Sequence, residues 1–274
     1  MRLKKVFILL LLGCCVAFTS GCWDSANKNI PADSVGAKLD SLVTTAVVQD
    51  QFAMPNVGDT VAKITVEGYG DIWCRFFPEA APKAVDNFIA LANAGKYNGV
   101  KFHRVIKNFM IQTGGNSDSI YKEKNEPFPH ELNQSLRQFS GALCMASTGD
   151  FQSGQSCQFY IVTSDMGKNA DLNSIKATTK AVNLRKGYNL YPNYTEKDIQ
   201  LYKEHGGNPP GDMVYTVFGQ VIGSKSMEVV KKISECKIKE QMSYMRREAS
   251  TPDPDVILKE VTIQKYEQKN EGEI

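Results

Sequence analysis

The sequence predicts a mainly β fold, an antiparallel barrel whose ends are capped by two helices. Many short runs of strand-forming residues follow one another, separated by turns rich in Gly, Asn and Ser, which is typical of a barrel or sandwich. Two longer stretches instead carry apolar residues at helical spacing. The 274 residues, 42% hydrophobic and 23% charged, suffice for one domain of about 200 residues with a single core.

The first residues have the pattern of a secretory leader. Basic residues precede an apolar run over 6–18, which is too short for a normal transmembrane helix. The run ends in TSGC, which resembles the lipobox at which bacterial lipoproteins are acylated and cleaved. We therefore expect a lipoprotein signal peptide over 1–21, lipid attachment at Cys22, and an extracytoplasmic protein anchored to a bacterial membrane through its lipid.

Two alternatives remain for this leader. Thr19 stands where the lipobox usually has Leu, and Cys14, after Leu12 and Gly13, is a second candidate inside the apolar run. An uncleaved leader would hold the protein on the same outward face of the membrane.

Residues 22–60 are weakly periodic and interrupted by Pro and Gly, which predicts a tether with at most one short helix, near 37–48. The pattern changes at Val61, where alternating apolar residues over 61–66, a Gly-rich turn and the run 72–77 predict a β-hairpin. Pro82 then begins an amphipathic helix that extends to about Ala94, with Gly95 just past its end.

The remaining elements complete the predicted barrel. Further strands are expected at 101–106, 110–112, 142–145, 159–162 and 214–221, followed by a second capping helix over 226–235 and a closing strand from Val256 to Ile263. The domain would span 61–268, leaving 269–274 as a tail.

An insertion with weak patterning occupies about 165–212. One helix is predicted in it, from Thr195 to His205, because Thr195 and Asp198 have the spacing of a capping box and two glycines follow. A solvated insertion is the favoured interpretation, and a partner surface is the alternative.

Charge, cysteines and histidines exclude some function classes. A net charge of +2 gives no reason to expect nucleic acid as a partner. Four cysteines lie in the predicted domain, which allows three disulfide pairings or free core thiols: Cys74, Cys144, Cys157 and Cys236. The three histidines are too scattered for a metal site, and each is expected to make local hydrogen bonds: His103, His130 and His205.

One long motif carries the chemistry. Residues 97–115 read YNGVKFHRVIKNFMIQTGG, which closely resembles the signature of the cyclophilin family. The segments GALCMAS at 141–147, QFYI at 158–161 and YTVFG at 215–219 resemble other active-site segments of that family in order and spacing. The resemblance covers about 61–265.

The resemblance implies a closed eight-stranded antiparallel barrel capped by two α-helices. It implies a peptidyl-prolyl cis-trans isomerase that acts on proline-containing polypeptides and needs no cofactor. The leader suggests that these polypeptides are exported proteins, and we expect a monomer without a metal. Arg104 matches the family's catalytic arginine. Twisting an X-Pro bond removes its resonance and leaves a lone pair on the proline nitrogen, so a fixed cationic donor there stabilises the transition state.

The resemblance also implies the residues that bind the substrate. Those that match the proline pocket are Phe109, Met110 and Tyr160, those that match the peptide-backbone contacts are Gln112, Ala146, Ser147 and Gln158, and Tyr215 occupies the place of the usual pocket histidine. A charge-assisted hydrogen bond contributes about 1.5–3 kcal/mol, whereas a roughly 10⁵-fold acceleration needs about 7 kcal/mol. Arg104 alone would therefore not suffice, and the pocket must contribute.

The chain departs from the family at several of these positions. Tyr160 replaces Phe, Ser147 replaces Asn, and residues 209–212, PPGD, replace a segment with an aromatic residue and Leu, so one apolar wall is expected to be missing or rebuilt, with weakened cyclosporin-type binding. Without the motif, Phe109, Met110 and Tyr160 would be interpreted as core residues and Arg104 as a surface position on a strand. The functional alternatives are a proline-peptide-binding chaperone with little turnover and, less favoured, a barrel that carries a small molecule.

Overall fold

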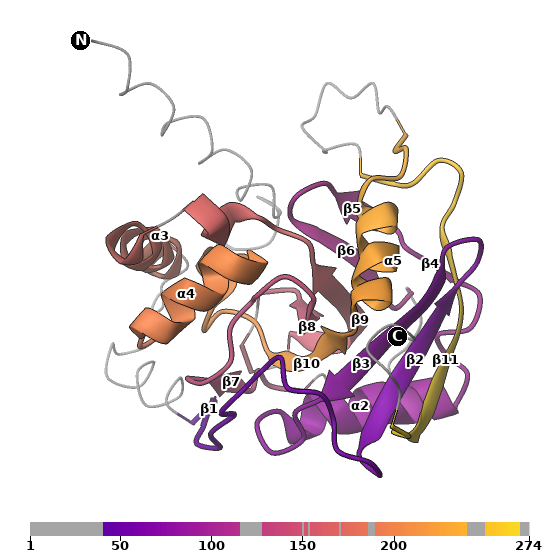
Figure 1. The fold of residues 1–274 in the computed structure, drawn as a ribbon, viewed down its shortest axis with the longest axis horizontal. Coiled ribbons are helices and arrows are strands. Elements are labelled where there is room, and N and C mark those ends of the chain that lie inside the picture. Colours follow the sequence, from indigo (N-terminus) through magenta and orange to yellow (C-terminus); the bar gives the residue numbers. More distant parts are fainter. Residues whose placement is uncertain are drawn as a thin grey trace, which may run out of the picture.

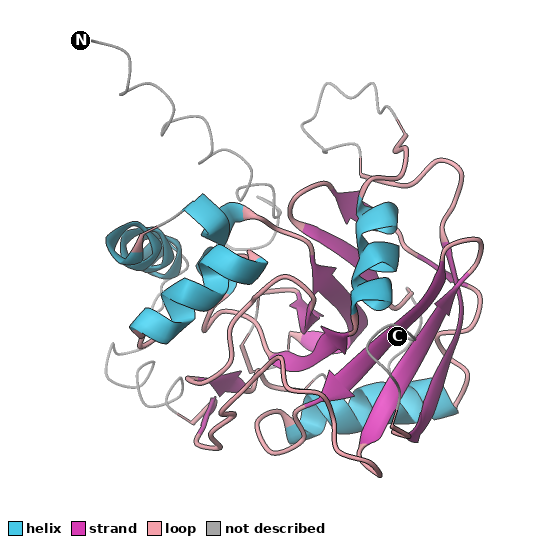
Figure 2. Cartoon of the chain, in the orientation of Figure 1, coloured by secondary structure: helices cyan, strands magenta, loops and turns pink. Residues whose placement is uncertain are grey.

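The computed structural model describes residues 41–115, 128–149, 151–152, 154–169, 171–185, 190–239, 250–268 and 274. Its main feature is a nine-stranded sheet that curls around a core, with four helices outside it (Figures 1 and 2). The strands of this sheet are β2 (Thr60–Val66), β3 (Gly70–Phe76), β4 (Val100–Lys101), β5 (Arg104–Ile106), β6 (Met110–Thr113), β8 (Ala142–Ser147), β9 (Gln155–Val162), β10 (Val217–Ile222) and β11 (Ile257–Lys265).

The sheet is antiparallel throughout, in the order β4-β11-β2-β3-β10-β8-β9-β6-β5. The predicted hairpin is confirmed as β2 and β3, and β11 pairs with β2 as the predicted closing strand. The alternating apolar positions of these strands, such as Ala62, Ile64 and Val66, are buried in one core, as the period of two in a half-buried strand requires.

The prediction of a closed eight-stranded barrel is wrong. Within the part of the chain that the structure describes, the sheet has nine strands and two edges, β4 and β5. The expected strand 101–106 is divided between them because Phe102, buried in the core, interrupts it. The stretch before Phe102 pairs with β11 and the stretch after it with β6, so the sheet forms a half-barrel.

Helices α2 (Pro82–Asn93) and α5 (Ser224–Ser234) confirm the two predicted capping helices. Both bury apolar residues in the same core, among them Phe88 of α2 and Val230 of α5, and Figure 1 shows α2 along the lower edge of the sheet with α5 upright across it. No side chain caps α2 from its own N-cap residue. Instead, the buried Glu131 carboxylate accepts hydrogen bonds from the backbone N–H groups of Lys83 and Ala84, at 3.1 and 3.0 Å, so it takes the place of the missing cap.

Residues 41–59 pack against the sheet-bearing domain. The strand β1 (Val43–Thr44) pairs with β7 (Leu132–Asn133) in parallel, and the side chain of Gln51 is buried between Arg137 and Gln220. The short helix expected near 37–48 is not found over 41–48, the described part of that range. Long-range pairing has replaced the weak local preference of this segment.

The insertion forms a second layer, which Figure 1 shows on the left of the view, away from α2 and α5. It contains α3 (Leu172–Arg185), α4 (Glu196–His205) and the short 3-10 helices η3 (Met166–Asn169) and η4 (Pro209–Gly211). Helix α4 confirms the predicted helix, with Thr195 and Asp198 forming the capping box. Helix α3 was not predicted. In the described residues we find no helix whose length and apolar character would let it cross a membrane.

Candidate active site

The candidate site lies on the outer face of the half-barrel, on four neighbouring strands. Pairing places Arg104 of β5 opposite Gln112 of β6, Gln112 opposite Tyr160 of β9, and Tyr160 opposite Cys144 of β8. Directly paired residues project from the same face of a sheet. Four residues that are distant in sequence therefore form one row across the strands, and two of them are predicted substrate-binding residues beside the predicted catalytic arginine.

The period of two in each strand separates this row from the core. Residues one step along the strands, such as Val105, Ile111 and Phe159, belong to the main core. The outward-facing set forms a separate apolar cluster that includes Met110. Its buried members are Phe77, Ala80, Met110, Leu136, Ala142, Cys144, Tyr160, Val162 and Val217, and partly buried members include Ile106, Phe109, Ala146 and Tyr215. The cluster is thus the floor of a site and not part of the barrel interior.

The predicted site residues differ in exposure. Met110 and Tyr160 are buried, whereas the others are half-buried and so accessible from outside: Arg104, Phe109, Gln112, Ala146, Ser147, Gln158 and Tyr215. The structure brings Phe109, Met110, Ala146, Tyr160 and Tyr215 into one apolar cluster and joins Arg104, Gln112 and Gln158 by hydrogen bonds. Ser147 follows Ala146 and contacts His130 and Gly149 instead. Cys22 lies outside the described residues.

A relay of amide side chains orients the Arg104 guanidinium. Its Nη1 donates to Oε1 of Gln112 at 3.4 Å, Nε2 of Gln112 donates to Oε1 of Gln158 at 3.0 Å, and Nε2 of Gln158 donates to the Gly115 carbonyl at 2.8 Å. Each amide has its oxygen toward the arginine, so the relay fixes which way Gln112 faces. A guanidinium carries five N–H donors in a planar fork, and this contact engages one of them through Nη1.

Burial and the neighbouring Arg104 cation lower the pKa of His103, with burial the larger cause. His103 also contacts Gln158 through its side chain. A neutral imidazole beside Arg104 avoids repulsion between two cations. Arg104 is thus the cation that this pair retains at neutral pH.

A tight turn positions the aromatic wall. Asn108, between β5 and β6, has a positive φ of 57°, a conformation that Asn tolerates better than most residues. Its Oδ1 accepts a hydrogen bond from the Asp165 N–H at 2.6 Å. The turn holds Phe109 against the apolar cluster, and Tyr215 meets the ring of Tyr160 edge-on across it, with centroids 5.8 Å apart.

The hydroxyl of Tyr160 lies inside the protein near Cys144 and Gln138, and burial raises the pKa of Tyr160 well above its usual range. Tyr in place of Phe therefore adds a polar group below the pocket, while the ring belongs to the apolar cluster.

Gln138 connects Tyr160 to the segment that replaces the family's aromatic wall. Its Nε2 donates to the Gly211 carbonyl at 2.9 Å, and its Oε1 accepts from the Asn208 side chain at 2.9 Å. A Cβ at Gly211 would collide with the Gln138 amide. The segment is thus buried and fixed to Gln138 as part of η4, and whether it replaces the apolar wall stays a prediction.

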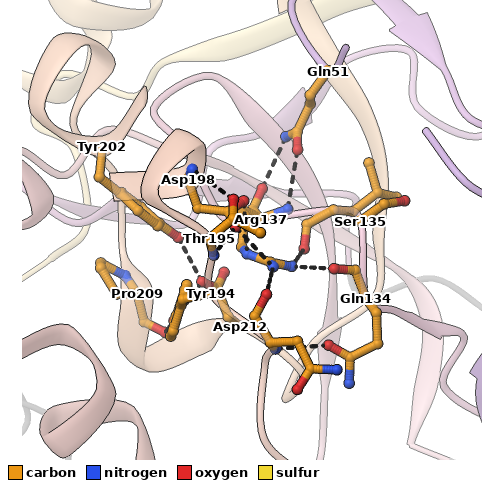
Figure 3. Close-up of polar contacts among 12 residues, drawn as sticks. Gln51, Gln134, Ser135, Arg137, Tyr194, Thr195, Asp198, Tyr202, Pro209 and Asp212 are labelled. Carbon is orange, nitrogen blue, oxygen red and sulfur yellow. Dashed lines mark hydrogen bonds and ion pairs between the residues drawn. The ribbon is translucent and has the colours of Figure 1, made fainter. Parts of the chain in front are cut away.

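Behind η4, a buried polar network joins the insertion to the site (Figure 3). One Asp212 carboxylate oxygen accepts hydrogen bonds from the hydroxyls of Tyr194 at 2.7 Å and Tyr202 at 2.6 Å, and the other accepts the Gln138 N–H at 2.7 Å. Nearby, the buried Arg137 guanidinium pairs with Asp198 at 3.3 Å. Burial raises the pKa of Asp212 to about 6, although Arg137 and the three donors act in the opposite direction.

Two other kinds of chemistry concern the cysteines and the possible metal ligands. All four described cysteines are free, so no disulfide joins them. Among the described residues, no cluster of three or more His, Cys, Asp or Glu side chains has the arrangement of a metal site. His130, Gln138 and Asp212 were not predicted as site residues, because their contacts join segments tens of residues apart.

Three comparisons with known proteins agree with this geometry. The family model described as cyclophilin type peptidyl-prolyl cis-trans isomerase/CLD matches residues 61–266. A Staphylococcus saprophyticus protein named as a peptidyl-prolyl cis-trans isomerase is 34% identical over 187 residues, which cover 66% of this chain and 84% of the relative. A Staphylococcus aureus protein with the same name is 31% identical over 201 residues, 71% of this chain and 87% of that one.

Two further proteins resemble larger parts of the chain. A Streptococcus pyogenes protein, named as a bifunctional phosphatase/peptidyl-prolyl cis-trans isomerase, is 30% identical over 88% of this chain, which spans about half (47%) of that relative. The crystal structure of a Cryptosporidium parvum cyclophilin type isomerase, solved in the presence of the dipeptide Ala-Pro, has a TM-score of 0.50 at 22% identity and covers 75% of this chain and 99% of its own. This last likeness supports the fold alone.

Proposed function

This chain belongs to the cyclophilin family of peptidyl-prolyl cis-trans isomerases, and we propose that it isomerises X-Pro bonds in exported polypeptides with Arg104 as its catalytic residue. The observation that supports this mechanism is the cross-strand row in which Arg104 pairs with Gln112 and Gln112 pairs with Tyr160. A charged donor and an apolar ring pocket are what this reaction requires.

The reaction needs stabilisation of a twisted amide. Rotation about the X-Pro bond has a barrier near 20 kcal/mol because the planar amide has partial double-bond character. At the twisted geometry the nitrogen becomes pyramidal and gains a lone pair. An N–H of Arg104 aimed at that nitrogen would bind the twisted state more strongly than the planar one.

The pocket supplies the remainder. One charge-assisted hydrogen bond contributes about 1.5–3 kcal/mol. Holding the proline ring against Phe109, Met110 and Tyr160, with the peptide backbone along Gln112 and Ala146, fixes one side of the rotating bond so that the other side turns freely. Because the nitrogen only rehybridises, no covalent intermediate, cofactor or metal takes part.

The N-terminal pattern supports the location. A lipid on Cys22 would hold the isomerase on the outer side of a bacterial membrane, where newly exported chains fold. Mass spectrometry of the mature N-terminus tests this part, and an unmodified peptide that contains both Cys22 and upstream residues would refute it.

Kinetics of a proline tetrapeptide test the catalytic role. We expect Arg104→Ala to lower kcat/KM by about 10- to 100-fold, the factor that corresponds to one charge-assisted hydrogen bond. Arg104→Lys should recover only part of the loss, because Lys keeps the charge without the planar fork. Lys63→Ala, which removes a cation from β2 that pairs with Asp71, is the matched control and should leave kcat/KM within about twofold of the wild type.

A wild type that binds the peptide yet isomerises it no faster than Arg104→Ala would overturn the catalytic proposal. That result would favour the alternative, a proline-peptide-binding chaperone with little turnover.

A further inference from the structure

His130 lies beneath two segments of the candidate site and contacts both. It is almost fully buried. Its Nδ1 lies 3.0 Å from the carbonyl oxygen of Val214, next to Tyr215, and its Nε2 lies 2.8 Å from Oγ of Ser147. Ser147 and Tyr215 both belong to the predicted substrate-binding set, so a single buried ring connects them.

Chemistry determines the tautomer of this ring. A carbonyl oxygen can only accept a hydrogen bond, so Nδ1 carries the proton. In the neutral imidazole Nε2 is then an acceptor, and the Ser147 hydroxyl donates its only hydrogen to it. The ring is held in this orientation by the Phe151 ring, with centroids 4.5 Å apart, and by its own backbone N–H, which donates to the Phe151 carbonyl at 2.8 Å.

The Ser147 hydroxyl therefore has its hydrogen and one of its lone pairs engaged within the protein. Its hydrogen points inward to His130, and one lone pair accepts the Gly149 N–H at 3.0 Å. Its second lone pair can still accept a hydrogen bond, and the side chain is half-buried. It can accept a hydrogen bond but cannot donate one.

We propose that His130 is a positioning residue that makes Ser147 a pure hydrogen-bond acceptor, which recognises a backbone N–H of the bound proline peptide. This inference rests on the proposed function, since it concerns the same groove. An amide side chain at position 147 would offer both a donor and an acceptor. The His130–Ser147 pair instead selects a peptide segment that presents an N–H to the end of β8 and disfavours one that presents a carbonyl.

Two substitutions separate the two contacts of His130. The amide of Asn reaches about as far as Nδ1 and retains the bond to Val214, whereas that of Gln reaches about as far as Nε2 and retains the contact with Ser147. We expect His130→Asn to raise both KM and the dissociation constant for a labelled proline tetrapeptide by about threefold to tenfold, the range for one hydrogen bond, with kcat within about twofold. His130→Gln should bind the peptide more tightly than His130→Asn.

The Ser147→Ala background shows whether the effect passes through the hydroxyl. There, His130→Asn should change peptide affinity by less than twofold. An equal loss in both backgrounds, or no loss in either, would overturn the proposal. Thermal unfolding of each variant shows whether it is folded. If His130→Asn is unfolded, the role of Ser147 is tested instead by comparing the binding of modified peptides to Ser147→Ala and to the wild type.

Those peptides replace one backbone N–H at a time by an ester oxygen. On the wild type, one ester peptide should bind about threefold to tenfold more weakly than the unmodified peptide. On Ser147→Ala, the same ester peptide should bind as tightly as the unmodified peptide. If every ester peptide binds the wild type as well as its parent, Ser147 is not the acceptor and the proposal fails. Because binding is measured directly, this failure is distinct from that of the isomerase proposal, in which the wild type would bind peptide without accelerating its isomerisation.

Discussion

Replacing Asp212 by Asn should remove a component of stability that depends on pH. Burial raises the pKa of this carboxyl from its usual 3.8 to about 6 in the folded protein. The native state therefore holds the proton more tightly than the unfolded state, and the stabilisation is complete below about pH 4 and lost as pH rises to about 6. A difference of about two pKa units corresponds to roughly 3 kcal/mol.

Urea unfolding of the wild type and Asp212→Asn at pH 4, 5, 6 and 7 measures this component. Because the other acidic groups contribute equally to both proteins, they cancel in the difference between the two free energies of unfolding. We expect the advantage of the wild type to be larger at pH 4 than at pH 7 by about 3 kcal/mol. Asp86→Asn, which removes an exposed carboxylate from α2, is the matched control.

Tyr202→Phe provides a second check on the cause. The Tyr202 hydroxyl donates to the Asp212 carboxylate at 2.6 Å and so favours its charged form. Removing this donor should raise the pKa of Asp212 further and move the pH window upward. A difference between wild type and Asp212→Asn that is constant from pH 4 to pH 7 would refute the reasoning.

Three other predictions concern the fold. Glu131→Ala should lower the free energy of unfolding by about 1–2 kcal/mol, because it removes the cap of α2. Glu131→Gln should lower this free energy by less, since one carboxyl oxygen remains as an acceptor, and equal decreases in urea titrations would contradict this. Phe88→Ala should cost about 3–5 kcal/mol by the same method, because the fully buried Phe88 ring packs against four other aromatic rings. Native protein treated with a thiol reagent should lose one reactive thiol on Cys236→Ser substitution and none on Cys74→Ser. Burial raises the pKa of both thiols, but Cys74 is fully buried while Cys236 is partly exposed, so the reagent reaches only Cys236 of the two.

The sequence predicted the strands and the capping helices well because their signals are local. Alternating apolar residues over 61–66 define β2 whatever surrounds them, and Thr195 with Asp198 specifies the start of α4 within four residues. The site residues were identified through the long motif, and their neighbourhood follows from it because pairing in register brings Arg104, Gln112 and Tyr160 into one row.

The elements that were missed depend on contacts distant in sequence. The apolar residues of α3 do not gather into a strong stripe on one face, and Thr179 on this helix is buried with hydrogen bonds to Tyr194 and the Pro209 carbonyl. No local pattern marks such a helix. The strand β1 likewise exists only because β7, about ninety residues later, offers a parallel edge.

Gln138 fixes the segment in which the chain departs from the family. A buried amide has a donor end and an acceptor end, and leaving either unpaired is costly. The Oε1 of Gln138 accepts from the Asn208 side chain, and its Nε2 donates to the Gly211 carbonyl. A Cβ at Gly211 would collide with the same amide. A glycine and a buried amide therefore specify this segment where the family has an aromatic residue and Leu, and neither of them stands out in the sequence until the fold brings positions 138 and 211 together.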